Sequence, residues 1–263
     1  MVAVIGIPLD ENSSYLQGAA QAPAKIRGAY HSPSSNYCAE DGTDLSQCSQ
    51  WKDLGDLSLP AGEMAIQEIT RKISSALQSH DNVLCLGGDH SVSYAVVKAV
   101  AGKYPGLNIL HLDAHSDLYA DFEGNRYSHA CPFARIMEEG LAKRLVQVGI
   151  RTLNPHQREQ AKKFGVEIIE MKNWDDRLQF SFDGPVYISL DLDVLDPAFA
   201  PGVSHHEPGG LTTRQVLSII QQVKGKMVGA DIVELNPQRD LNDMTAMVAA
   251  KFFKELLARL IKN

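Results

Sequence analysis

Short apolar runs along the chain alternate with stretches in which apolar residues recur every three or four positions. Apolar runs bounded by turn residues are typical of strands buried on both faces, and the longer spacing is typical of amphipathic helices. The runs predict strands at Val2–Ile7, Val83–Gly87, Asn108–Asp113, Arg144–Val148, Glu167–Glu170, Pro185–Leu190 and Met227–Val233. The amphipathic stretches predict helices at Ala22–His31, Gly62–Ser79, Ser91–Lys103, His129–Glu139, Pro155–Phe164, Thr212–Val223 and Asp243–Lys262. This alternation predicts an α/β fold with a mostly parallel sheet covered by helices.

The segment Ser32–Leu59 shows neither pattern. It is polar and rich in Ser, Asp and Gly, so we expect a long loop over the surface or rim. No internal repeat or linker divides the sequence, and a chain of this length can bury about 70–75% of its surface around a core. We therefore expect a single domain over residues 1–263.

Charge and composition indicate which partners are disfavoured and which cellular compartment we expect. The chain has 25 basic and 32 acidic residues and a formal charge of −7, which disfavours nucleic acids and anionic membranes as partners. No apolar run approaches the ~18–20 residues needed to span a bilayer. The cysteines form no C-x-x-C pair, which favours a reducing compartment; they are Cys38, Cys48, Cys85 and Cys131. We expect a cytoplasmic protein, or an organellar one whose targeting peptide has been removed.

Candidate chemistry lies at the predicted strand ends. In Asp113-Ala-His-Ser-Asp117, the side chains of Asp113, His115 and Asp117 alternate, so an extended backbone would project them to one side. A solvated acidic turn is the alternative. Like charges beginning inside an apolar strand are costly to bury unless a positive charge lies between them, which favours metal ligation.

Two further strand ends carry the same kinds of side chain. Asp191 and Asp193 end the strand near residue 190, and His90 follows the tight turn expected at Gly87-Gly88. His90 alone would also fit a capping or packing role. Taken together, four aspartates and two histidines predict a pair of divalent cations bridged by shared carboxylates.

The ligand types indicate which metal. Oxygen-rich sites with one imidazole per ion suit Mn²⁺ better than Zn²⁺, which prefers tetrahedral sites rich in thiol and imidazole. Mg²⁺ seldom takes histidine. Two cations at such a site lower the pKa of a bound water, so the reaction class that we expect is metal-assisted hydrolysis.

These motifs resemble the signatures of the ureohydrolases, the arginase and agmatinase family. The resemblance rests on Gly-Gly-Asp-His at 87–90, Asp-Ala-His-Ser-Asp at 113–117, Ser-Leu-Asp-Leu-Asp-Val-Leu-Asp-Pro at 189–197 and Glu-Pro-Gly-Gly-Leu at 207–211. They occur in the family's order and spacing over almost the whole chain. The resemblance implies a three-layer α/β/α sandwich, two Mn²⁺ per subunit, and hydrolysis of a guanidino compound to urea and an amine.

The resemblance also implies individual roles. His90 and Asp117 would hold one manganese, His115 and Asp193 the other, and Asp113 and Asp191 would bridge both. His129 fills the place of the family's proton shuttle. Glu234 corresponds to the glutamate that pairs with the substrate guanidinium, and Asn125 is a candidate for substrate binding.

The segments around residues 122–138, 147–151 and 236–240 look most like plant-type arginases, which implies L-arginine as the substrate. Agmatine, or a guanidino acid other than arginine, is the alternative, because Glu207-Pro-Gly-Gly also occurs in agmatinases and Cys131-Pro132 departs from the plant pattern. A one-zinc deacetylase-like amide hydrolase and a non-catalytic scaffold are remoter alternatives. The family resemblance implies a homo-oligomer, either a trimer or a hexamer.

Overall fold

The structure is a computed structural model that describes residues 1–262. Its strands are β1 (Val2–Gly6), β2 (Trp51–Asp56), β3 (Asn82–Leu86), β4 (Asn108–Leu112), β5 (Arg144–Ile150), β6 (Glu167–Glu170), β7 (Ser181–Asp191) and β8 (Lys224–Val233). Its helices are α1 (Ala22–Tyr30), α2 (Glu63–Ser79), α3 (Val92–Lys103), α4 (Pro132–Glu138), α5 (Pro155–Phe164), α6 (Thr213–Gln222) and α7 (Met244–Ile261). Three short 3₁₀ turns are η1 (Ala19–Gln21), η2 (Met171–Asn173) and η3 (Leu192–Val194).

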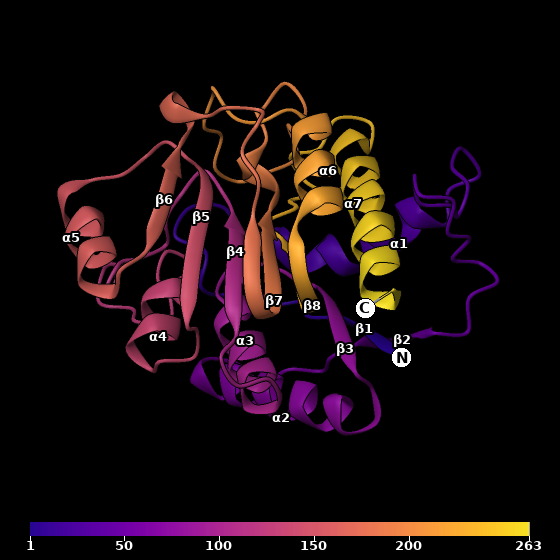
Figure 1. The fold of residues 1–263 in the computed structure, drawn as a ribbon, viewed down its shortest axis with the longest axis horizontal. Coiled ribbons are helices and arrows are strands. Elements are labelled where there is room, and N and C mark those ends of the chain that lie inside the picture. The colour runs from indigo at the N-terminus through magenta and orange to yellow at the C-terminus, as the bar shows by residue number, and fades with distance from the viewer. Residues whose placement is uncertain (263) are drawn as a thin grey trace.

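The strands form one sheet in the order β2-β1-β3-β8-β7-β4-β5-β6, and all neighbouring strands are parallel (Figure 1). The order matters for function, because β8 and β7 lie between β3 and β4. Parallel strands present all their carboxyl ends at one edge, so segments far apart in the sequence meet there.

Helices cover both faces of the sheet, which confirms the predicted three-layer α/β/α sandwich (Figure 1). Side chains alternate along each strand, so Leu84 and Leu86 of β3 pack into one core and Val83 and Cys85 into the other. The first core includes residues of α1, α6 and α7, and the second includes residues of α2, α3 and α4. Helix α2 shows the sequence basis of this packing, because its buried residues recur every three or four positions.

The structure corrects two boundaries. The predicted loop Ser32–Leu59 contains β2, an edge strand with mostly exposed side chains, Trp-Lys-Asp-Leu-Gly-Asp. An edge strand that buries little has no apolar alternation to reveal it. Helix α4 begins at Pro132, and the residues from His129 to Cys131 lie before it in the loop. No helix among residues 1–262 is both long and apolar enough to cross a membrane.

Candidate metal centre

The central strands deliver the predicted site residues to one place. His90 follows β3, the Asp113–Asp117 segment follows β4, Asp191 ends β7, and Glu234 follows β8 directly. These strands are consecutive in the sheet, in the order β3-β8-β7-β4. The four strand ends therefore lie side by side, although they span more than half of the sequence.

Close packing of glycine shapes the turn after β3. A Cβ atom on Gly88 would collide with the carbonyl oxygen of Leu9, and Asp89 N donates to that oxygen at 2.8 Å. The segment after β1 therefore lies directly against this turn. Neither Gly87 nor Gly88 has a positive φ, so the pair is required for close approach rather than for a left-handed turn.

The first group of ligand-type side chains surrounds the His90 imidazole. Its Nδ1 atom lies 3.0 Å from Asp113 Oδ2, 3.1 Å from Asp117 Oδ2 and 3.1 Å from Asp191 Oδ2. All four side chains are buried. One nitrogen and three carboxylate oxygens thus converge on one small volume.

The other side of the His90 ring shows why a cation fits here. His90 Nε2 lies 3.0 Å from Ser189 Oγ, which in turn donates to Asp231 Oδ1 at 2.7 Å. Because the hydroxyl proton of Ser189 goes to the carboxylate, Ser189 Oγ accepts from His90 Nε2–H. In the neutral ring, Nδ1 then presents a lone pair to three anionic oxygens, an arrangement that is relieved either by a proton on Nδ1 or by a metal cation between these atoms.

Burial and the crowding of carboxylates around His90 also shift the pKa values of His90 and Asp191. Burial alone would lower the pKa of the His90 imidazole, but its hydrogen bonds to the aspartates raise that pKa well above the usual range. Burial, followed by the charges of Asp193 and Asp113, raises the pKa of Asp191 well above its usual value. Ionised carboxylates are costly at this position unless a cation offsets them.

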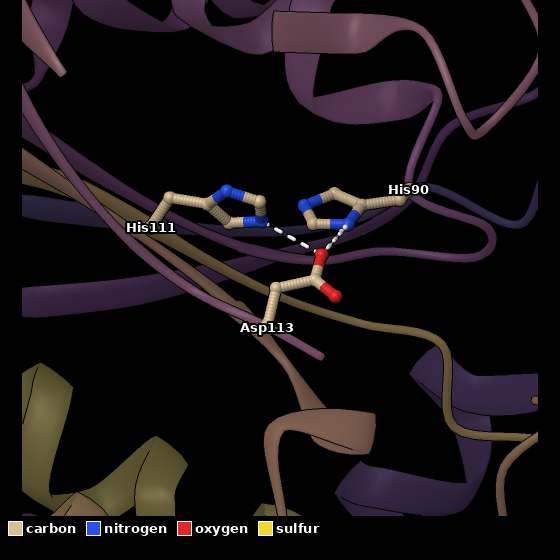
Figure 2. A group of neighbouring side chains, drawn as sticks. All are labelled: His90, His111 and Asp113. Atoms are coloured by element: carbon tan, nitrogen blue, oxygen red, sulfur yellow. Dashed lines mark hydrogen bonds and ion pairs between the residues drawn. The ribbon is translucent and has the colours of Figure 1, made fainter. Parts of the chain in front are cut away.

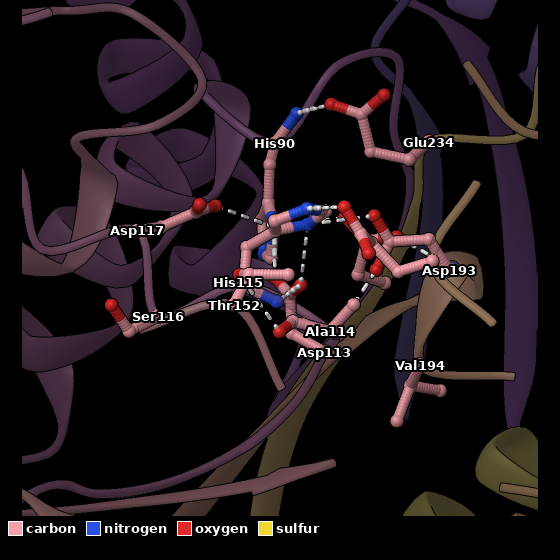
Figure 3. A network of polar contacts seen from close by, with 12 residues as sticks. His90, Asp113, Ala114, His115, Ser116, Asp117, Thr152, Asp193, Val194 and Glu234 are labelled. Atoms are coloured by element: carbon pink, nitrogen blue, oxygen red, sulfur yellow. Dashed lines mark hydrogen bonds and ion pairs between the residues drawn. The ribbon is translucent and has the colours of Figure 1, made fainter. Parts of the chain in front are cut away.

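The second group is centred on His115. Its Nδ1 lies 3.0 Å from Asp193 Oδ2 and 3.5 Å from Asp113 Oδ1. Asp113 therefore turns one oxygen toward each imidazole, Oδ2 toward His90 and Oδ1 toward His115. The two groups together contain all six residues that the sequence predicted as ligands, and Asp113 lies between them (Figure 3).

Two residues of the site have backbone conformations that are costly for side-chain-bearing residues. Asp117 has φ 51° and Glu234 has φ 65°. Left-handed conformations of this kind cost about 1–3 kcal/mol and persist where the surrounding structure enforces them. Here they turn two carboxylates toward the strand-end cluster.

His129 lies beside the predicted metal ligands and contacts two further residues, Glu234 and Ser14. Its Nδ1 lies 2.8 Å from Glu234 Oε1, and the same oxygen accepts from the backbone N–H of His90 at 2.8 Å. Its Nε2 accepts from Ser14 N at 3.1 Å and lies 2.7 Å from Ser14 Oγ. Burial would lower the pKa of His129, but the charge and hydrogen bond of Glu234, together with the charges of Asp89 and Asp117, raise it to about 9.

A cavity of about 200 Å³ opens beside these groups. The predicted residues His115, Asp117, His129, Asp191, Asp193 and Glu234 line it. Its walls also include residues that the sequence analysis did not select, namely Ser14, Tyr119, Phe122, Thr152, Gln157 and His205. They are scattered over loops and helix starts, and only Phe122 lies in a segment that the sequence analysis had compared with known enzymes.

His205 is notable among these lining residues. Its ring centroid lies 5.2 Å from that of His129 and 5.8 Å from that of His115. Its Nε2 is buried and has no hydrogen-bond partner among the described residues. Burial, with the nearby charge of His129, lowers the pKa of His205, which favours a neutral ring in the cavity wall.

Asn125 lies outside the lining of this cavity and is exposed. Its amide donates to Asn12 Oδ1 at 3.2 Å, and its Oδ1 accepts from Tyr127 N at 2.8 Å. These contacts hold the loop that carries His129. The role of Asn125 in substrate binding stays a prediction.

His111 is a ligand-type residue that the sequence analysis missed. It lies within β4, two positions before Asp113, and forms a compact group with Asp113 and His90 (Figure 2). A lone histidine in an otherwise apolar strand was its only signal in the sequence.

The fold and the site define a class, the metal-dependent hydrolases with a parallel α/β/α sandwich. The sequence model of the Arginase family matches residues 1–258, and the chain belongs to this family. The match separates the chain from the deacetylase-like alternative.

Individual relatives agree with this assignment. The chain is 48% identical to mitochondrial arginase 1 of Arabidopsis thaliana, over 99% of this chain and 81% of that protein. It is 34% identical to an agmatinase of Bacillus cereus, over 99% of this chain and 92% of that protein, which makes the agmatinase the more distant relative. The solved structure of the arginase from Medicago truncatula superposes with a TM-score of 0.94 at 45% identity, covering 98% of this chain and 87% of that one.

Proposed function

We propose that this protein hydrolyses L-arginine to L-ornithine and urea. The observation that carries the proposal is the pair of imidazole–carboxylate groups that share Asp113 beside a cavity lined by His129 and Glu234. The plant relatives named as arginases, at 48% identity, support arginine as the substrate.

We propose two Mn²⁺ ions per chain as the resident metals. His90, Asp113, Asp117 and Asp191 would hold one ion, and His115, Asp113, Asp191 and Asp193 the other. Carboxylate-rich sites with one imidazole each suit Mn²⁺. When bound, such a pair lowers the pKa of water and supplies hydroxide near neutral pH.

The protein's own residues bind the substrate cation and manage the proton. A guanidinium group has N–H donors and no acceptor, so the buried Glu234 carboxylate is a suitable partner for it in the cavity wall. The leaving amine needs a proton, and His129 is the imidazole placed to hold one. A proton at Nδ1 faces Glu234, and Nε2, which accepts from Ser14 N, lies beside Ser14 Oγ in the cavity wall.

The second candidate is agmatine hydrolysis, which the agmatinase relative favours. A urea-release assay on manganese-loaded protein separates the two, using L-arginine, agmatine and 4-guanidinobutyrate as substrates. We expect the highest kcat/KM with L-arginine. A higher value with agmatine would replace the proposal by the second candidate, and no urea from any of the three would overturn both.

We further propose a single catalytic domain over residues 1–263 that assembles into a trimer or hexamer, as the family resemblance implies. Light scattering after size-exclusion chromatography tests the assembly against the 28.8 kDa chain mass. For the compartment, the cytoplasm stays our expectation. The plant relatives are named as mitochondrial or chloroplastic proteins, which makes an organelle the second candidate.

A further inference from the structure

His111 is the last residue but one of β4, two positions before Asp113, and is fully buried. Its Nε2 is 2.7 Å from Asp113 Oδ2, the oxygen that also faces His90 Nδ1 at 3.0 Å (Figure 2). This geometry allows two roles. His111 is either a third imidazole ligand or a hydrogen-bond donor that holds the carboxylate of Asp113.

The neighbouring strand decides between these roles. Gln147 of β5 is the register partner of His111, and its side-chain Nε2 lies 3.0 Å from His111 Nδ1 and 2.6 Å from the carbonyl oxygen of Ser116. A flipped amide would place Oε1 against that carbonyl, with two acceptors in contact. The Ser116 carbonyl therefore fixes the Gln147 amide so that its nitrogen donates to both neighbours.

It follows that His111 Nδ1 is an acceptor. A neutral imidazole has one N–H, and with Nδ1 accepting from Gln147 that proton resides on Nε2. Nε2–H then donates to Asp113 Oδ2. A ring nitrogen that carries a proton has no lone pair for a metal, so the ligand role is excluded by the hydrogen bonds of Gln147.

We infer that His111 is a positioning residue, and that Ser116, Gln147 and His111 form a relay that orients the carboxylate shared by both metal sites. The inference deepens the proposed metal centre and rests on it. Asp113 faces both His90 and His115, so a rotation of its carboxylate would disturb both sites at once.

Packing makes this relay rigid. The ring of His111 stacks on Phe133 with centroids 3.8 Å apart and planes at 24°. Gln147, His111 and Asp113 all have 0% exposure, so water does not compete for their hydrogen bonds. Partners of metal ligands in such positions typically contribute about 10–100-fold to metal affinity.

Calorimetric titration of metal-stripped protein with Mn²⁺ tests the role. We expect His111→Phe, which keeps an aromatic ring but removes the donor, to weaken Mn²⁺ binding by about 10–100-fold with an unchanged number of sites. His111→Gln should recover part of the affinity, because its amide can donate to Asp113. Phe133→Leu is the matched control, since it loosens the packing but leaves the donor, and its loss of Mn²⁺ affinity should be smaller than that of His111→Phe.

Two results of the titration would overturn the inference. Loss of one whole Mn²⁺ equivalent in both His111→Phe and His111→Gln, with the other site unchanged, would make His111 a ligand. Wild-type affinity in His111→Phe would leave it no role at the metal centre.

A second measurement uses the wild-type protein without metal, so it does not depend on how any variant folds or binds Mn²⁺. In metal-free wild-type protein, the ¹⁵N shifts of the His111 ring report its tautomer, and we expect protonated Nε2 with unprotonated Nδ1. A proton on Nδ1 would overturn the relay. Neither readout uses turnover, so a wild-type protein that binds Mn²⁺ but releases no urea would refute the proposed function and leave this inference intact.

Discussion

His129 and Glu234 are separated by 105 residues in the sequence, yet His129 Nδ1 and Glu234 Oε1 lie 2.8 Å apart. Both side chains are buried, and both line the cavity. The ion pair therefore joins the residue proposed to carry the proton with the residue proposed to bind the substrate cation. Substitutions at these two positions should differ in their effects.

His129→Ala should lower turnover by about 10²–10⁴-fold, the usual contribution of a positioned proton donor. Its manganese content should not change, because His129 is not among the proposed ligands. Urea release and elemental analysis measure the two effects. His156→Ala is the matched control, since this imidazole is exposed on helix α5 and does not line the cavity. Near-normal turnover in His129→Ala would refute the proton-donor role, and loss of manganese would make His129 a ligand.

Glu234→Gln should raise KM for L-arginine and also lower kcat. The carboxylate would pair with the substrate guanidinium in both the ground state and the transition state, so its loss weakens both. Initial rates over a range of arginine concentrations measure the effect. An unchanged KM would contradict the proposed contact.

Glu234→Gln should also lower the pKa of His129. Burial lowers that pKa, but the charge and hydrogen bond of Glu234, with smaller contributions from Asp89 and Asp117, raise it to about 9, and an amide carries no charge. Histidine in an unfolded chain titrates near 6.5, so the pair stabilises the fold fully below about pH 6.5, and this stabilisation is lost as pH rises through about 9. In metal-free protein, the destabilisation caused by Glu234→Gln should therefore be larger at pH 6 than at pH 10. NMR titration of His129 and urea unfolding at both pH values test this, and an equal destabilisation at the two would contradict it.

Asp191→Asn should reduce the manganese content by at least one ion per chain. The substitution removes a negative charge from between two cations that repel each other. Elemental analysis after dialysis is the measurement. Asp121→Asn is the control, because it removes an exposed carboxylate that does not line the cavity. Full occupancy in Asp191→Asn would remove this residue from the proposed bridge.

Thiol labelling should divide the cysteines into two pairs. Burial raises the pKa of Cys131 to about 12 and that of Cys85 well above the usual thiol value. Cys38 and Cys48 are only partly buried. Because the thiolate is the reactive form, we expect two thiols to react with Ellman's reagent at pH 8 in native protein and four after unfolding. Rapid reaction of all four in native protein would contradict the buried environment.

Local pattern in the sequence determined the core strands and the ligand-type residues at their ends. Strands buried on both faces appear in the sequence as apolar runs. In Asp113-Ala-His-Ser-Asp117, an extended backbone is enough to project alternate side chains to the same side. The pattern did not reveal β2, because an exposed edge strand has no apolar periodicity. It also selected Asn125, whose side chain in the structure bonds to Asn12 and Tyr127, contacts that no local pattern indicates.

Only the tertiary structure decided which side chains meet. The insertion of β8 and β7 between β3 and β4 sets Glu234 against His90, and the register of β4 with β5 sets Gln147 against His111. Strand order and register follow from packing of the whole sheet rather than from any one segment. The sequence therefore supplied the ligand-type residues, whereas their hydrogen-bond partners, and with them the tautomers of His90 and His111, depend on contacts between distant strands.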